Sequence, residues 1–164
     1  MDLYIVRHAI AEERQSGLDD RDRPLSDEGI TKMKRNAAAL AAIGAVPDVI
    51  LCSPLARARQ TADILMEAFS GRPALEVIPA LAPPANRPDL YEAIRSHERA
   101  DALMLVGHEP SLGEIAAEIL SGSPASYLLL KKGGACKIGI AGLDPAPSGF
   151  LHWLMPPAIL RLLG

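Results

Sequence analysis

Short apolar runs alternate along the chain with longer stretches of helical periodicity, a pattern typical of an α/β domain. Four of the runs are almost continuously apolar, as parallel strands are when helices cover both faces of their sheet. These predicted central strands are residues 3–6, 49–52, 75–78 and 103–106. Two weaker runs, 135–140 and 150–155, are expected to complete the edges of the sheet.

Helical spacing of apolar residues predicts four helices between these strands. The first is expected to begin after Ser26 and to end at Gly44, and the second to begin at Ser53, with that serine as its N-cap. A weaker signal places a third helix over residues 88–99, and a fourth is expected to begin at residues 110–111. The proline-rich stretch 79–88 is expected to be a loop. The pattern therefore predicts a three-layer sandwich, with a mostly parallel sheet between two helical layers.

Composition narrows the class of protein. The 164 residues fit one domain spanning 1–164, and 49% hydrophobic with 23% charged residues excludes wholesale disorder. The net charge of −3 argues against a nucleic-acid or membrane-surface partner, and no apolar run approaches the roughly 18 residues that a membrane span requires. Cys52 and Cys136 are expected to be buried free thiols. With no signal peptide visible, a cytoplasmic location is expected.

Polar clusters follow three of the predicted strands. Arg7 and His8 follow the first, the segment 53–62 with Arg57 follows the second, and His108 follows the run 103–106. Functional residues of open α/β sheets gather beyond the carboxyl ends of the strands. We therefore expect two histidines and several arginines to converge at one edge of the sheet.

This combination suits phosphoryl transfer through a covalent phosphohistidine. A neutral imidazole is a competent nucleophile at neutral pH. Arginine supplies permanently charged, bidentate donors for the oxygens of the transferred group. Because the sequence has no C-x-x-C, H-E-x-x-H or clustered carboxylate motif, no metal or other cofactor is expected.

Three motifs resemble those of the histidine phosphatase (phosphoglycerate-mutase-like) superfamily. LYIVRHA at 3–9 is similar to its R-H-G motif, SPLARARQTA at 53–62 to its second arginine motif, and VGH at 106–108 to its second histidine motif. Chain length, motif order and RPLS at 23–26 are most similar to the small bacterial phosphohistidine phosphatases of the SixA type. The resemblance runs from residue 1 to about residue 120.

The resemblance implies a role for each matching residue. His8 is the expected nucleophile, Arg7 and Arg57 the expected phosphate ligands, and His108 the second histidine, which binds phosphoryl oxygens and stabilises the transition state. Arg23, in the R-P-L pattern, is a candidate phosphate or substrate contact. Other arginines, among them Arg14, Arg21 and Arg59, are expected to be solvated surface charges. His97 and His152 are expected to be structural or exposed.

Two positions depart from the family pattern. Ala9 stands where the motif has glycine, and it would be strained if that position needed a positive φ. The loop 81–87 has no clear match to the general-acid glutamate of the mutase branch. Glu109 is the candidate acid in this chain, and capping of the following helix is an equally good alternative for it.

The function predicted from the sequence is hydrolysis of phosphohistidine on a protein, for example a histidine-containing phosphotransfer domain. The chain leaves little room for a cap domain, and an open site suits a protruding protein side chain. The alternative is a phosphomonoesterase for a small molecule such as a sugar phosphate or nucleotide. A mutase fits less well, because an intermediate that must rebind benefits from a closed site. A phosphate-binding module without catalysis is the alternative from another class.

Overall fold

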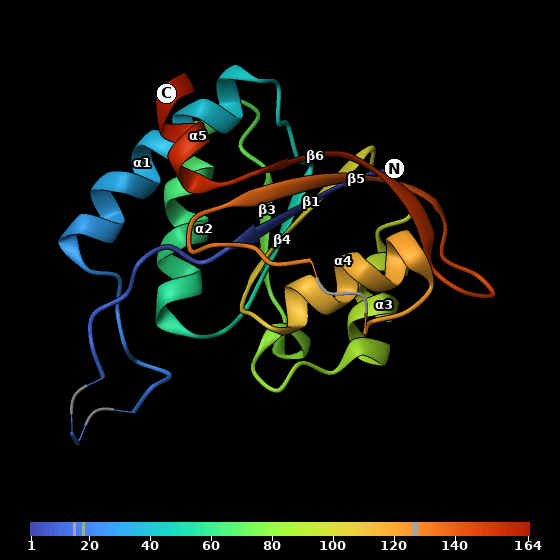
Figure 1. Cartoon of the computed structure of the whole chain (residues 1–164), viewed down its shortest axis with the longest axis horizontal. Helices are drawn as coiled ribbons and strands as arrows, with labels where there is room; N and C mark the ends of the chain where they lie inside the picture. Colours follow the sequence, from blue (N-terminus) through green and yellow to red (C-terminus); the bar gives the residue numbers. More distant parts are fainter. Residues whose placement is uncertain (15, 18, 126–127) are drawn as a thin grey trace.

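A six-stranded mixed sheet forms the centre of the computed structural model, which describes residues 1–14, 16–17, 19–125 and 128–164 (Figure 1). The strand order is β3-β2-β4-β1-β5-β6. The first four strands in the chain run parallel, whereas β5 is antiparallel to β1 and β6 to β5. The strands are β1 Asp2–Arg7, β2 Val49–Cys52, β3 Ala74–Val77, β4 Ala102–Gly107, β5 Ala135–Gly142 and β6 Ser148–Met155.

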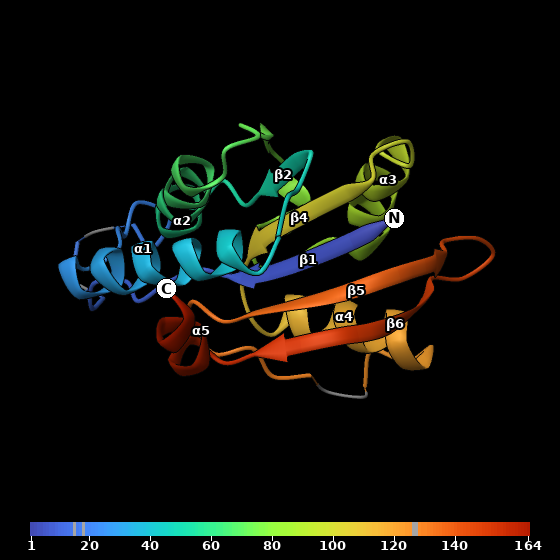
Figure 2. The same ribbon diagram turned by 90° about the horizontal axis from the view of Figure 1, so that it is seen from above.

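Helices cover both faces of this sheet (Figures 1 and 2). On one face lie α1 Asp27–Ala42, α2 Ala56–Ala68 and α5 Pro157–Leu163. On the other lie α3 Arg87–Ser96 and α4 Ser111–Ser121, with a 3₁₀ turn, η1 Pro79–Leu81, in the proline-rich loop. The predicted three-layer α/β architecture is confirmed, while α5 was not predicted. In the described part of the chain, no helix has the length and apolar character needed to cross a membrane.

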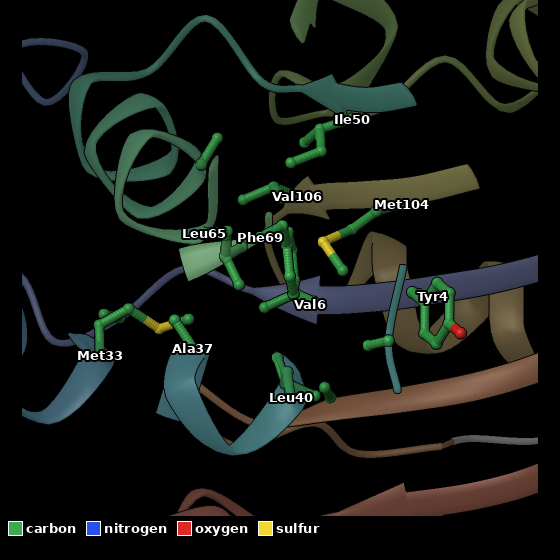
Figure 3. Packing of buried hydrophobic residues seen from close by; sticks show 14 of the residues in the cluster. Tyr4, Val6, Met33, Ala37, Leu40, Ile50, Leu65, Phe69, Met104 and Val106 are labelled. Carbon is green, nitrogen blue, oxygen red and sulfur yellow. The ribbon is translucent and has the colours of Figure 1, made fainter. Parts of the chain in front are cut away.

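The central strands are apolar throughout because they contribute alternate side chains to two cores. Tyr4 and Val6 of β1 point to the α1–α2 side, where they pack with apolar residues of these helices and of β2 and β4 (Figure 3). Leu3 and Ile5 point to the α3–α4 side. All four side chains are buried, and burying an aliphatic side chain such as those of Leu3, Ile5 and Val6 contributes about 1.5–3 kcal/mol. These two cores hold β1, and the residues at its carboxyl end, in place.

Several local predictions can be compared with the structure. As expected, α1 begins directly after Ser26, and Ser26 is its N-cap, since its hydroxyl accepts a hydrogen bond from the Gly29 amide at 3.1 Å. The predicted cap of α2 is wrong, because that helix begins at Ala56 with Leu55 as N-cap and has no side-chain cap. The strand predicted at 75–78 is not central: β3 is an edge strand with largely exposed side chains. Cys52 and Cys136 are buried free thiols, as expected.

Candidate active site

The carboxyl ends of three adjacent strands bring the predicted residues together. The His8 amide donates to the Gly107 carbonyl of β4 at 3.0 Å, and the Ser53 amide donates to the Val106 carbonyl at 2.9 Å. As a result, the ring centroids of His8 and His108 lie 4.9 Å apart, at an interplanar angle of 54°. His8, His108 and Arg57 are all at most 6% exposed. Two imidazoles and a guanidinium therefore share one largely desolvated site.

His8 is oriented by the backbone of its own loop. Its Nδ1 lies 2.7 Å from the carbonyl oxygen of Ala9. Because a carbonyl oxygen only accepts, Nδ1 carries the proton, and Nε2 of the neutral ring keeps its lone pair. Burial lowers the pKa of His8 to about 3, and the neighbouring charges of Arg57 and Arg7 act in the same direction. His8 is therefore neutral at physiological pH, with Nε2 available as a nucleophile.

The backbone at Ala9 is tied to the helix that carries Arg57. The Ala9 amide donates to Thr61 Oγ1 at 3.1 Å, and this hydroxyl donates to the Arg57 carbonyl at 2.7 Å. Thr61 is fully buried. Ala9 itself has no positive φ; outside glycine, the described residues show one only at Arg72. Alanine in place of the motif glycine is therefore not strained. Thr61 links the backbone at Ala9 to that at Arg57, a role that its place in the motif at 53–62 did not indicate.

Arg57 is held by Asp20, from the segment between β1 and α1. Its Nη1 donates to the Asp20 carbonyl at 2.7 Å and its Nη2 to Asp20 Oδ2 at 3.1 Å. Arg23 Nε donates to Oδ1 of the same carboxylate at 2.8 Å, and Arg14 Nε lies 3.2 Å from that oxygen. Although partial burial opposes it, the hydrogen bond from Arg23 and the charge of Arg57 lower the pKa of Asp20. Asp20 thus connects Arg23 to the site.

Arg7 and Glu109 both bind the backbone of Leu130, one at its carbonyl and the other at its amide. Arg7 Nη1 donates to the Leu130 carbonyl at 2.8 Å, and Glu109 Oε1 accepts from the Leu130 amide at 2.8 Å. Glu109 Oε2 accepts from the amide of Gly113, in the first turn of α4, at 3.3 Å. Burial raises the pKa of Glu109 in spite of these bonds. The carboxylate makes the contacts expected of the capping alternative, while its acid role stays a prediction.

His108 has a partner on the neighbouring strand end. Its Nε2 lies 2.8 Å from Oγ of Ser53, which is fully buried. Burial lowers the pKa of His108 to about 4, and the charge of Arg57 contributes. The second imidazole is therefore also neutral at physiological pH. Sequence reasoning missed this contact because Ser53-Pro54 has the form of a helix start.

The remaining histidines lie elsewhere. His97 follows α3 and its Nε2 lies 3.0 Å from Glu76 Oε1 on β3, and His152 lies on β6, where its side chain is 39% exposed. Within the described ranges, no three histidine, cysteine or acidic side chains gather as a group that could hold a metal ion. The site combines the positive charge of Arg7 and of buried Arg57 with the neutral imidazoles of His8 and His108. This arrangement is suited to the oxygens of a phosphoryl group.

Comparison with known proteins identifies the family of this chain. The model of the histidine phosphatase superfamily (branch 1) matches residues 3–82. An uncharacterized protein of Picosynechococcus sp. is 44% identical over 136 residues, which are 82% of this chain and 82% of that protein. The chain belongs to the histidine phosphatase superfamily.

More distant relatives match almost the whole chain. Phosphohistidine phosphatase SixA of Escherichia coli is 24% identical over 164 residues, 99% of this chain and 98% of that protein. The solved structure of protein histidine phosphatase SixA with tungstate has a TM-score of 0.83 at 23% identity and covers 96% of this chain and 98% of that one. The alpha-ribazole phosphatase of Shigella flexneri has a TM-score of 0.76 at 17% identity, covering 97% and 98%. The expected SixA-type fold is confirmed.

Proposed function

We propose that this phosphatase removes the phosphoryl group from a phosphorylated histidine of another protein, through a covalent phosphohistidine at His8 and without a metal ion. The observation that carries the proposal is the orientation of His8. Its Nδ1 is bound to the Ala9 carbonyl, which leaves the Nε2 lone pair free beside His108 and the buried arginine Arg57. The similarity to a phosphohistidine phosphatase along almost the whole chain supports the same substrate class.

In the first step, His8 Nε2 attacks phosphorus as the bond from phosphorus to the substrate imidazole breaks. The substrate ring enters protonated on its other nitrogen, so the nitrogen released from phosphorus keeps the electron pair of that bond and the ring leaves as a neutral imidazole. Arg7, Arg57 and His108 hold the phosphoryl oxygens, whose charge these donors stabilise strongly in a buried site. In the second step, water attacks phosphorus, releases inorganic phosphate and restores neutral His8.

The environment of Glu109 favours phosphohistidine over an alkyl ester as substrate. Departure of an alkoxide needs a strong proton donor, and both oxygens of the Glu109 carboxylate already accept backbone hydrogen bonds. A phosphohistidine ring can itself be protonated near neutral pH, so its departure needs less help from the enzyme.

The length of the connections at this edge of the sheet favours a protein substrate. The two longest are residues 8–26, between β1 and α1, and 122–134, between α4 and β5. Each has a residue bound to an arginine of the site, since Asp20 binds Arg57 and the Leu130 carbonyl binds Arg7. These contacts support a site that stays open, which a side chain projecting from another protein can enter from outside.

The test is hydrolysis of a protein labelled with ³²P on histidine. We expect the enzyme to release the label, and the His8→Ala variant to release none while keeping the wild-type fold. His152→Ala is the matched control and should retain full activity, because His152 lies on β6. A phosphoenzyme that is acid-labile and absent from His8→Ala would distinguish catalysis from phosphate binding alone. Release of label that does not depend on His8 would overturn the proposal.

The second candidate is a phosphomonoesterase for a small molecule, because an alpha-ribazole phosphatase shares the fold. A panel of sugar phosphates, nucleotides and other phosphomonoesters separates the two. If one of these esters had a far higher kcat/KM than the phosphorylated protein, the second candidate would be correct.

A further inference from the structure

Ser53 is a buried hydroxyl at the centre of the site, without a role in the steps above. It follows β2 directly, and its backbone is fixed on both sides. Its amide donates to the Val106 carbonyl at 2.9 Å, and its carbonyl accepts from the Cys52 thiol at 3.2 Å. The side chain is fully buried, so its position relative to His108 on the neighbouring strand end is set by the sheet.

The hydrogen-bond partners of Ser53 decide which way its hydroxyl hydrogen points. Among the described residues, Oγ has two partners: the Leu55 amide at 3.4 Å, which can only donate, and His108 Nε2 at 2.8 Å. A serine hydroxyl has one hydrogen, and a buried hydrogen without an acceptor costs about 1–3 kcal/mol. If His108 Nε2 carried a proton, the Ser53 hydrogen would have no acceptor. The favoured arrangement has Ser53 donating to an unprotonated Nε2.

We propose that Ser53 is a positioning residue that holds neutral His108 in the Nδ1–H tautomer, so that Nδ1–H is the group His108 donates to a phosphoryl oxygen. The other nitrogen supports this assignment. His108 Nδ1 is buried and has no hydrogen-bond partner among the described residues, which leaves a donor unsatisfied in the free enzyme. The His8 ring lies 4.9 Å away, centroid to centroid, so a phosphoryl group on His8 arrives beside the His108 ring.

The proposal deepens the proposed function, since it rests on His108 as a phosphoryl ligand. Its structural half needs no substrate, however, because a histidine tautomer is read directly from ¹⁵N chemical shifts. The chain has four histidines, so the spectrum is simple, and the His108→Gln variant identifies the signals of His108. A failure to hydrolyse phosphohistidine would therefore leave the tautomer measurement intact.

The first experiment is a ¹⁵N-histidine spectrum of the wild-type protein at pH 7.5. We expect a pyrrole-like shift for His108 Nδ1 and a pyridine-like shift for Nε2. The reverse pattern, with the proton on Nε2, would overturn the proposal. This measurement stands even if substitutions at Ser53 impair folding.

The second experiment removes the hydroxyl. In Ser53→Ala we expect His108 to lose its single tautomer and kcat for p-nitrophenyl phosphate to fall about tenfold, the effect of roughly one hydrogen bond, with little change in KM. Ser53→Thr keeps the hydroxyl and should keep both the tautomer and most of kcat. The matched control is Ser121→Ala, which removes a serine hydroxyl from the end of α4. An unchanged Nδ1–H tautomer in Ser53→Ala would show that Ser53 does not hold it.

Discussion

Substitution of Arg57 is the sharpest test of the phosphate-binding role at this site. Arg57 is 5% exposed, and its guanidinium makes two hydrogen bonds to Asp20. Hydrogen bonds that involve a charged group contribute about 1.5–3 kcal/mol each, and each 1.36 kcal/mol of lost transition-state stabilisation costs tenfold in rate. If Arg57 gives two such bonds to the transferring phosphoryl group, Arg57→Ala should lower kcat by about 10²-fold or more.

The fold should survive this change. Asp20 keeps its contacts with Arg23 and Arg14 when Arg57 is removed, so its carboxylate is not left as a buried unpaired charge. Arg57→Lys should give an intermediate rate, because it keeps the charge and loses the bidentate geometry.

The assay is steady-state hydrolysis of the labelled phosphoprotein and of p-nitrophenyl phosphate, with thermal unfolding measured in parallel. Arg59→Ala is the matched control, because Arg59 is also an arginine of α2, two residues further along. It should retain nearly the wild-type rate. A near-normal kcat in Arg57→Ala, or an equal loss in Arg59→Ala, would refute the phosphate-binding role.

Three further predictions concern His8 and the residues around it. In the folded protein the pKa of His8 is lowered to about 3 and that of His108 to about 4, so below pH 6.5 the unfolded chain binds more protons than the folded protein. The free energy of unfolding, measured with urea, should therefore decrease as the pH falls from 6.5 towards 4. It should decrease less in the His8→Asn variant. Thr61→Val should lower the free energy of unfolding by about 1–3 kcal/mol and reduce kcat, because the Ala9 amide loses its hydrogen-bond acceptor. Thr61→Ser should restore both quantities. An unchanged kcat in Thr61→Val would contradict the role of Thr61 in linking Ala9 to α2. Glu109→Gln should lower the melting temperature and should reduce kcat by similar factors for aryl and alkyl phosphates, as expected of a capping residue. A much larger loss of kcat for the alkyl ester would instead identify Glu109 as the general acid.

The positions of Arg7, His8, Arg57 and His108 could be anticipated from the sequence for a simple physical reason. Arg7 ends a strand that is apolar on both faces and the other three follow such strands, and the carboxyl ends of neighbouring parallel strands lie at one edge of a sheet. The pattern of strands therefore predicts that these residues converge, without any knowledge of side-chain contacts.

The partners of these residues could not be anticipated in the same way. Asp20 lies in a segment where acidic and basic residues alternate, and the sequence does not show which carboxylate bends back to Arg57. Ser53 satisfies the rules for a helix N-cap, yet its hydroxyl is close to a histidine 55 positions away. Such pairings depend on how loops close over the sheet, and local propensity does not encode that. β3 was misplaced for a related reason, since an apolar run does not reveal whether a second neighbouring strand covers it.

The place of β1 in the sheet has a consequence for the order in which the protein acquires its activity. β1, which directly precedes the proposed nucleophile His8, pairs with β4 on one side and β5 on the other, and both follow it by about a hundred residues or more in the chain. During translation, Leu3 to Val6 must remain without either partner until residues 102–107 have left the ribosome. Non-local pairing of this kind slows folding and leaves an apolar strand open to association with other nascent chains. His8, the proposed nucleophile, therefore reaches its working environment only after a segment about a hundred residues further along the chain has been made.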